Sequence, residues 1–149
     1  MRNNWIAVAS SEHARRGCAG PGGGYMQVCH GKRAPLQRVA PGDRVVYYAP
    51  TLTMRGKDKC QRFVSLGLVQ DGEPYAFDMG GGFVPFRRDV AYVPAREASI
   101  LPLLPQLAFV TDPRHWGYHF RLGLFRISDA DMRVVARAMQ VDLQRVHLH

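Results

Sequence analysis

Short runs of β-branched and aromatic residues with turns between them most constrain the fold of this chain. The clearest run is residues 44–49, which follow the turn signal Pro41-Gly42-Asp43. Similar runs occupy residues 5–10, 63–69, 89–93 and 122–127. No repeat of about 20–50 residues and no heptad array competes with this pattern. We therefore expect an α+β fold in which a small, closed and mostly antiparallel β-barrel is flanked by short helices.

Two helices are expected from capping signals. The stronger one begins at Ser128, which with Asp131 resembles a capping box. Apolar residues then recur at helical spacing, at Met132, Val135, Ala136 and Met139. A shorter helix is expected to start with Ser11 as its cap and to stop near Gly17.

Turn signals divide the middle of the chain. Asp71-Gly72 predicts a hairpin between residues 63–69 and 75–77. Three glycines at 80–82 mark a further turn, after which Pro85 confines its neighbours to an edge strand or a bulge. Residues 51–59 lack a period and carry three basic side chains, so we expect an exposed basic loop there.

The chain is long enough for one domain. Its 149 residues are 46% hydrophobic, which suffices to fill one core. We expect a single domain over residues 1–149, with its core in about 4–140. Residues 141–149 are expected to form a short frayed tail that ends in two histidines.

The charge balance favours an anionic partner. Lys and Arg number 20 against 12 Asp and Glu, which gives a net charge of +8. Such a balance suits a polyanion such as RNA or DNA, although a basic protein without such a partner is the alternative. Arginine dominates, and its planar fork suits phosphates and base edges better than lysine does.

Neither metals nor membranes are indicated. The three cysteines are odd in number and lack a CxxC spacing, and no two histidines lie at ligand spacing beside a carboxylate. We therefore expect no disulfide framework, no metal and no cofactor. The longest apolar runs are too short for a signal peptide or a membrane span, so we expect a cytoplasmic protein, with a monomer favoured.

A glycine loop at residues 22–24 leads into a segment rich in polar chemistry, residues 25–32. It is not a phosphate-binding P-loop, because Met26 stands where the first glycine is required and Arg33 follows Lys32. Cys29 and His30 would point to opposite faces of an extended segment, which disfavours a nucleophile–base pair. The segment is thus interpreted as a non-covalent binding loop or as a glycine loop whose polar residues are solvated.

Aromatic and arginine side chains are interleaved at three further places. These are Tyr47-Tyr48, Phe86-Arg87-Arg88, and Trp116 with Tyr118, Phe120 and Arg121. Aromatic faces stack on bases while guanidinium groups bind phosphates, so the combination suits single or flipped bases. The rings could equally fill the core, and the two adjacent arginines could be a solvated strand edge.

Several of these segments resemble one family. Trp5–Ser10, Gln27–Lys32, Asp43–Tyr48, Phe83–Val90 and Trp116–Arg121 are together similar to the EVE domain of small stand-alone bacterial proteins. The resemblance covers nearly the whole chain, from about Trp5 to Met139. It implies a PUA-like β-barrel, related to the YTH and ASCH domains, with a pocket for a modified base that has aromatic walls and a basic rim.

The resemblance also implies site residues. Tyr25 and Trp116 are expected to sandwich the base, and Ser10, Gln27 and His30 to read its edge. Four cations would hold phosphates, namely Lys32, Arg87, Arg88 and Arg121. The wider candidate set of ligand-binding residues adds Cys29, Gly31, Tyr47, Tyr48, Pro85, Phe86 and Phe120.

The expected function is a non-enzymatic, nucleic-acid-binding module that recognises a modified base in RNA or DNA. Two alternatives stay open. An amidohydrolase acting on a modified nucleoside, as some ASCH relatives imply, would need Lys32 with Ser10 or Glu12. A pocket for a small metabolite would leave the basic surface without a direct role.

Overall fold

The computed structural model describes residues 2–19 and 23–149. Its strands are β1 (Asn4–Val8), β2 (Tyr25–Met26), β3 (Arg44–Thr51), β4 (Lys59–Val69), β5 (Tyr75–Ala76), β6 (Phe86–Tyr92), β7 (Ala98–Ser99) and β8 (Leu124–Ile127). Its α-helices are α1 (Ser11–Cys18), α2 (Arg33–Gln37) and α3 (Asp129–Ala138). Short 3-10 helices lie at η1 (Cys29–Gly31), η2 (Leu101–Gln106), η3 (Pro113–His115), η4 (Tyr118–Leu122) and η5 (Leu143–Val146). Gly22, the first residue of the glycine loop, lies outside the described residues, as do Gly20 and Pro21 before it.

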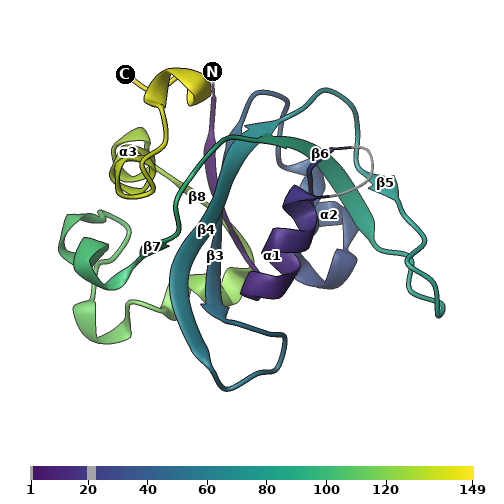
Figure 1. Ribbon diagram of the computed structural model, residues 1–149, viewed down its shortest axis with the longest axis horizontal. Coiled ribbons are helices and arrows are strands. Elements are labelled where there is room, and N and C mark those ends of the chain that lie inside the picture. The colour runs from purple at the N-terminus through teal and green to yellow at the C-terminus, as the bar shows by residue number, and fades with distance from the viewer. Residues whose placement is uncertain (1, 20–22) are drawn as a thin grey trace.

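The strands form one curled sheet. Their order is β2-β6-β4-β3-β1-β8, with β5 added beside β6 and β7 beside β4. Only β1 and β3 run parallel among the described pairs, so the sheet is mixed but mostly antiparallel. The sheet curls into a half-barrel with helices on both sides (Figure 1). The α+β class, with a mostly antiparallel sheet and short helices, is confirmed, whereas full closure is wrong, because no described ladder joins the end strands β2 and β8.

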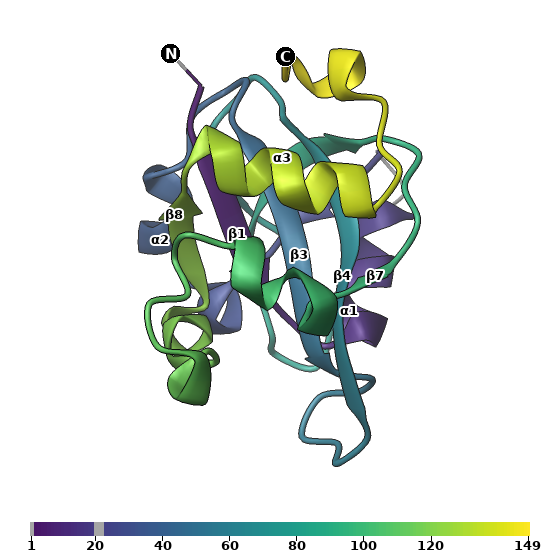
Figure 2. The ribbon, with the colours of Figure 1, turned by 90° about the vertical axis from the view of Figure 1, so that its left-hand side faces the viewer.

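Both faces of the sheet are buried. On one face, Tyr48 and Phe63 pack with α3 and η2, which Figure 2 shows lying across the strands. On the other face, Trp5 and Tyr47 pack with α1 and α2. Adjacent residues of a strand point to opposite faces, so Tyr47 and Tyr48 enter different clusters. Each tyrosine is at most 2% exposed.

The two predicted helices form, with one change of cap. Ser128 caps α3 by accepting from the backbone N–H of Asp131 at 3.1 Å, as predicted. The carboxylate of Asp131, however, accepts from Ala108 and Phe109 instead of closing a capping box. At α1 the cap is Ser10, whose hydroxyl accepts from the N–H of His13, and Ser11 is the first helical residue.

The predicted hairpin between residues 63–69 and 75–77 is wrong. Strand β5 pairs with β6 instead, Tyr75 opposite Arg87. The turn of the real hairpin contains the three glycines 80–82, whose φ angles of 86°, 62° and 82° favour glycine. This β5–β6 hairpin projects from the sheet (Figure 1) and carries Met79 and Phe83.

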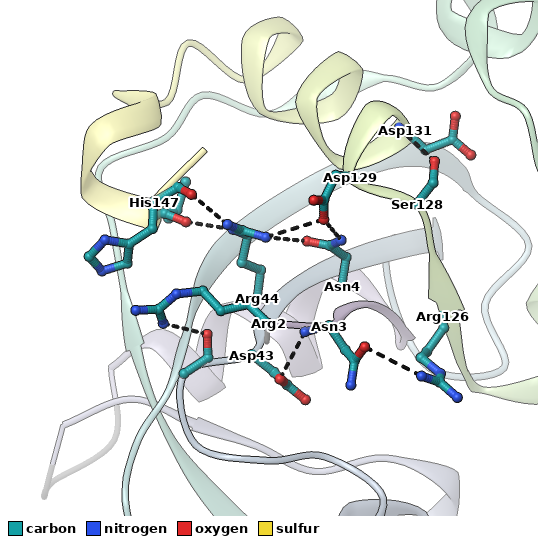
Figure 3. A network of polar contacts seen from close by, with 12 residues as sticks. Arg2, Asn3, Asn4, Asp43, Arg44, Arg126, Ser128, Asp129, Asp131 and His147 are labelled. Carbon is teal, nitrogen blue, oxygen red and sulfur yellow. Dashed lines mark hydrogen bonds and ion pairs between the residues drawn. The ribbon is translucent and has the colours of Figure 1, made fainter. Parts of the chain in front are cut away.

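The C-terminal residues are packed, not frayed. Val146 and Leu148 are 0% and 3% exposed and belong to the main core cluster. Arg44 of β3 donates to the carbonyl oxygens of Val146 and His147. The same guanidinium donates to Asn4 at 2.9 Å and lies 3.5 Å from the carboxylate of Asp129, so it joins three elements (Figure 3).

Candidate functional site

A cleft of about 790 Å³ opens beyond the end of β1. Its floor comes from Val8–Ser10, the start of α1 and the segment 27–32. Its rim comes from the β3–β4 loop, the tip of the β5–β6 hairpin and residues 121–123 before β8. A volume of this size accepts a small organic ligand such as a nucleoside.

Hydrogen bonds to its backbone N–H and carbonyl groups fix Gln27 on the floor of the cleft. It is 5% exposed, and its N–H donates to the Tyr47 hydroxyl oxygen at 2.9 Å. The same hydroxyl donates back to the Gln27 carbonyl oxygen at 3.1 Å, and His13 reaches that oxygen at 3.1 Å. Burial raises the pKa of Tyr47, which keeps its hydroxyl proton available for this bond.

The side-chain amide of Gln27 is oriented by Arg87. The Arg87 Nε–H donates to Gln27 Oε1 at 3.0 Å, and a guanidinium cannot accept, so the amide oxygen must face the arginine. Arg87 itself lies between two rings, with its Cζ atom 3.8 Å from the centroid of Tyr25 and 3.9 Å from that of Phe77. The amide of Gln27 therefore cannot turn over without losing this bond.

The amide nitrogen of Gln27 is left for a ligand. Its one described contact is with the thioether sulfur of Met79, a weak acceptor, at 3.9 Å. Both residues line the cleft. The floor of the cleft thus presents the N–H groups of a fixed side-chain amide. The oxygen of this amide already accepts from Arg87.

His13 is held as a neutral imidazole beside Gln27. Burial, partly offset by the hydrogen bond to Gln27 and reinforced by the charges of Arg16 and Arg87, lowers its pKa below the ordinary value of 6.5. Since a carbonyl only accepts, Nε2 must carry the proton that it donates to Gln27. The Nδ1 atom is then an acceptor, and it has no partner in the described ranges.

Three residues of the segment 27–32 have an unusual backbone. Cys29, His30 and Gly31 have φ angles of 51°, 62° and 80°, so three successive residues are left-handed. Such a backbone costs about 1–2 kcal/mol for each residue other than glycine. At Gly31 a side chain is excluded, because a Cβ atom would lie 2.4 Å from the Pro85 Cβ. The expected extended conformation at Cys29 and His30 is wrong.

Cys29 is not an activated nucleophile. Burial raises the pKa of its thiol, and its sulfur lies 3.7 Å from the carbonyl oxygen of Leu122. Raised pKa values disfavour the thiolate that would attack a substrate.

Positive charge surrounds the cleft. Arg16, Lys32 and Arg121 line it and are exposed, and no carboxylate is among its described lining residues. Apolar side chains complete the rim, with Met54 68%, Met79 41%, Phe83 46% and Leu122 61% exposed. The cleft therefore combines apolar surfaces with donors and cations.

Seven of the predicted site residues line this cleft. They are Ser10, Gln27, Cys29, His30, Gly31, Lys32 and Arg121. The hydroxyl oxygen of Ser10 already accepts from His13 as the cap of α1. It is therefore not free to accept from the edge of a base, as was predicted.

The predicted sandwich of Tyr25 and Trp116 is wrong. Tyr25 is buried, with its ring against the Arg87 guanidinium. The ring centroids of Trp116 and Phe120 lie 6.1 Å apart. Trp116 lines a separate hollow of about 130 Å³, which Asp112 also lines. The two hollows have no lining residue in common.

Other predicted contacts are also parts of the protein interior. Tyr48 stacks on Phe120 with a centroid distance of 4.1 Å, and Tyr47 holds Gln27. Pro85 is buried next to Gly31. Phe86 packs against the core cluster that contains Trp5 and Tyr47.

Arg87 and Arg88 do not form a basic rim. They are only 4% and 5% exposed, so the predicted phosphate contacts and the solvated edge are both wrong. Arg88 Nε is buried without a hydrogen-bond partner among the described residues.

Sequence reasoning missed His13, Arg16 and the apolar rim. The position of His13, three residues after the helix cap Ser10, could have placed it at the end of β1. Met79 and Phe83 could not have been assigned, because they reach the cleft only through the β5–β6 pairing that was not predicted.

The described ranges 2–19 and 23–149 contain no cluster of three potential metal ligands. None of the helices in that part of the chain has the length and apolar character that a membrane crossing needs.

Comparison with known proteins gives consistent matches. A family model described as EVE domain matches residues 3–138. A UPF0310 protein of Mesorhizobium japonicum is 54% identical over 141 residues, which cover 93% of each chain. UPF0310 protein YdcG of Bacillus subtilis is 36% identical over 146 residues, 98% of each chain. The crystal structure of protein Atu2648 from Agrobacterium tumefaciens is similar in fold, with a TM-score of 0.55 at 12% identity, over 93% of this chain and 94% of that one.

Proposed function

The chain belongs to the EVE domain family, and from this premise we propose that it is a non-enzymatic nucleic-acid-binding module whose cleft receives a modified nucleobase. Family membership supports a PUA-like binding module. The finer assignment to a base rests on the chemistry of the cleft.

The observation that carries the proposal is the fixed amide of Gln27 at the floor of a cationic cleft. An ordinary glutamine can turn its amide and so match either a donor or an acceptor. Here the amide oxygen of Gln27 accepts from Arg87, so only the N–H groups of this amide remain for the ligand. A ring nitrogen or carbonyl oxygen on a base edge is the acceptor that matches them.

The surroundings suit a nucleotide. Val8, Val28 and Phe83 offer apolar surface to a planar base and to an added methyl group. Lys32, Arg16 and Arg121 can neutralise the phosphates next to that base. A base taken out of its stack is the form that such a cleft can enclose.

The hydrolase alternative finds less support. Lys32 lines the cleft without a carboxylate among the described lining residues. Glu12 is not among the described lining residues of the cleft, and its Oε1 atom lies 3.9 Å from Arg16 Nη2. The Ser10 hydroxyl caps α1. General acid–base chemistry needs such groups within hydrogen-bond reach of one another.

Fluorescence anisotropy with short single-stranded oligonucleotides tests the proposal. The panel carries methylated cytosine, methylated adenine, their oxidised forms or no modification, in DNA and in RNA, at two salt concentrations. We expect one modified base to bind more tightly than the others, and Gln27→Leu to weaken that binding about tenfold or more.

The exposed substitution Gln37→Leu on α2 is the matched control and should bind like the wild type. Equal affinity for every oligonucleotide, unchanged in Gln27→Leu, would contradict a base-reading cleft. Release of a modified group from a nucleoside by the purified protein would support the hydrolase instead.

A further inference from the structure

A second hollow adjoins the cleft. Its volume is about 490 Å³, and it lies between α2 and β8. Leu122 lines both hollows, so they meet at this residue. The other lining residues used below are Asn3, Trp5, Arg38 and Arg126. We call this second hollow the α2–β8 groove.

Two exposed arginines flank the groove. Arg126 of β8 lies opposite Trp5 of β1 in the ladder, so their side chains share one face. The Cζ atoms of Arg126 and Arg38 lie 5.7 and 5.8 Å from the Trp5 ring centroid. Neither arginine forms an ion pair within the described ranges, and Arg126 has one exposed hydrogen bond, of 3.3 Å to Asn3 (Figure 3).

The carboxylate beneath the groove is already satisfied. Asp43 is 1% exposed and accepts from the Trp5 indole N–H, the Asn3 N–H and the Ala40 N–H at 2.9, 3.0 and 2.9 Å. These bonds fix the indole and occupy the oxygens of Asp43. The two arginines are therefore left to bind an external anion.

Two chain segments connect the cleft with the groove. Each has one cation at the cleft and one at the groove. The first runs from Lys32 through α2 to Arg38, and the second from Arg121 into β8 as far as Arg126. The cations thus continue from one hollow into the next.

We propose that the α2–β8 groove is a second subsite, which holds the sugar-phosphate backbone of the nucleotides beside the base in the cleft. This inference rests on the proposed function of the cleft. Guanidinium groups bind phosphate oxygens through paired N–H donors. Trp5 is only 3% exposed and cannot serve as a stacking platform, so the groove binds backbone and does not read sequence.

The test compares a mononucleotide with longer oligonucleotides that carry the same modified base. The double variant Arg38→Gln/Arg126→Gln should bind the oligonucleotide about tenfold more weakly, with its salt slope reduced by about 1.4 for two lost single-strand phosphate contacts. Its affinity for the mononucleotide should equal that of the wild type. The control Arg96→Gln/Arg145→Gln removes the same charge from exposed sites elsewhere and should keep the full oligonucleotide affinity.

Three results would overturn parts of this account. Equal losses in both double variants would assign the effect to net charge and exclude the subsite. If Arg38→Gln/Arg126→Gln kept the oligonucleotide affinity and the mononucleotide affinity of the wild type, the subsite in the groove would be excluded. The proposed function of the cleft would be unaffected. A wild type that binds none of the modified mononucleotides, yet binds every oligonucleotide with strong salt dependence, would contradict the proposed function itself.

Discussion

Two buried arginines, Arg44 and Arg87, show how one residue type serves two purposes. Arg44 and Arg87 are each 4% exposed. Arg44 lies near Asn4, where β1 begins, and its donors go to a side chain, two carbonyl oxygens and a carboxylate of the chain (Figure 3). Arg87 lies near the cleft beyond the end of β1 and donates from Nε to Gln27 alone among the described residues.

The difference lies in what each arginine leaves free. The partners of Arg44 come from three elements, so its role is to join them. The two rings around Arg87 hold its position without using its donors, and its one hydrogen bond sets the direction of an amide that faces the cleft. A buried cation is thus structural where the chain supplies its acceptors and serves ligand recognition where it orients a neighbour.

Replacement of Arg44 should have the largest effect on stability. Arg44→Met removes three hydrogen bonds from a charged donor, to the buried Val146 carbonyl oxygen, the part-buried His147 carbonyl oxygen and the Asn4 side chain, and should lower the free energy of unfolding by about 3–5 kcal/mol. Urea denaturation measures this loss, and the remaining folded protein should bind ligand as the wild type does. The exposed control Arg145→Met should change stability by less than about 0.5 kcal/mol. A stable Arg44→Met protein would contradict the joining role.

Replacement of Arg87 should cost less stability and more affinity. Arg87→Met removes one hydrogen bond and two cation–π contacts, about 1–3 kcal/mol in all. Because the Gln27 amide is then free to turn, affinity for the preferred oligonucleotide should fall about tenfold. Arg87→Lys retains a donor and should recover part of that affinity. If Arg87→Met bound ligand at full strength, the orienting role would be excluded.

Replacement of His30 by glycine should change stability less than the arginine replacements do, and in the opposite direction. Because its φ angle is 62°, His30→Gly should raise the free energy of unfolding by about 1 kcal/mol as the left-handed strain is removed. His30→Ala keeps that strain and should not stabilise the protein. Thermal denaturation of both variants checks this, and equal stabilities would show that the left-handed turn carries no strain.

The smallest effect concerns pH. His13 has a lowered pKa in the folded protein, so below its ordinary pKa of 6.5 the unfolded chain binds more protons than the folded one. Stability from this group is present above that pKa and declines as pH falls from 6.5 toward the folded value. The decline should be shallower in His13→Asn than in the wild type, whereas the exposed control His149→Asn should keep it. Identical profiles for His13→Asn and the wild type would contradict a neutral, part-buried His13.

The sequence was most informative where local rules decide. The run at residues 44–49 became β3, and the serine at 128 capped α3, because turn chemistry and capping act over a few residues. The alternation of Tyr47 and Tyr48 was also correct. What could not be foreseen is that both faces of the sheet are covered, so that both rings are buried.

The site was predicted in part for the same reason. The segment 27–32 and Arg121 lie where the resemblance implied, at the cleft. Tyr25 and Arg87 were assigned to base and phosphate, yet they contact each other, because the β2–β6 pairing brings Tyr25 close to Arg87 and the β5–β6 hairpin adds Phe77 over the guanidinium. The β2–β6 pairing joins segments that are far apart in the sequence, and no local pattern in the sequence indicates it.

NMR titration of uniformly ¹⁵N-labelled protein, which reports both glutamine side-chain amides and tryptophan indole N–H groups, tests most directly whether the Gln27 amide binds the base. On addition of the preferred modified mononucleotide, the account predicts that the Gln27 amide resonances shift and become protected from exchange. The indole resonance of Trp116, in its separate hollow, should stay in place. Shifts at Trp116 with none at Gln27 would contradict the account and place the ligand outside the cleft.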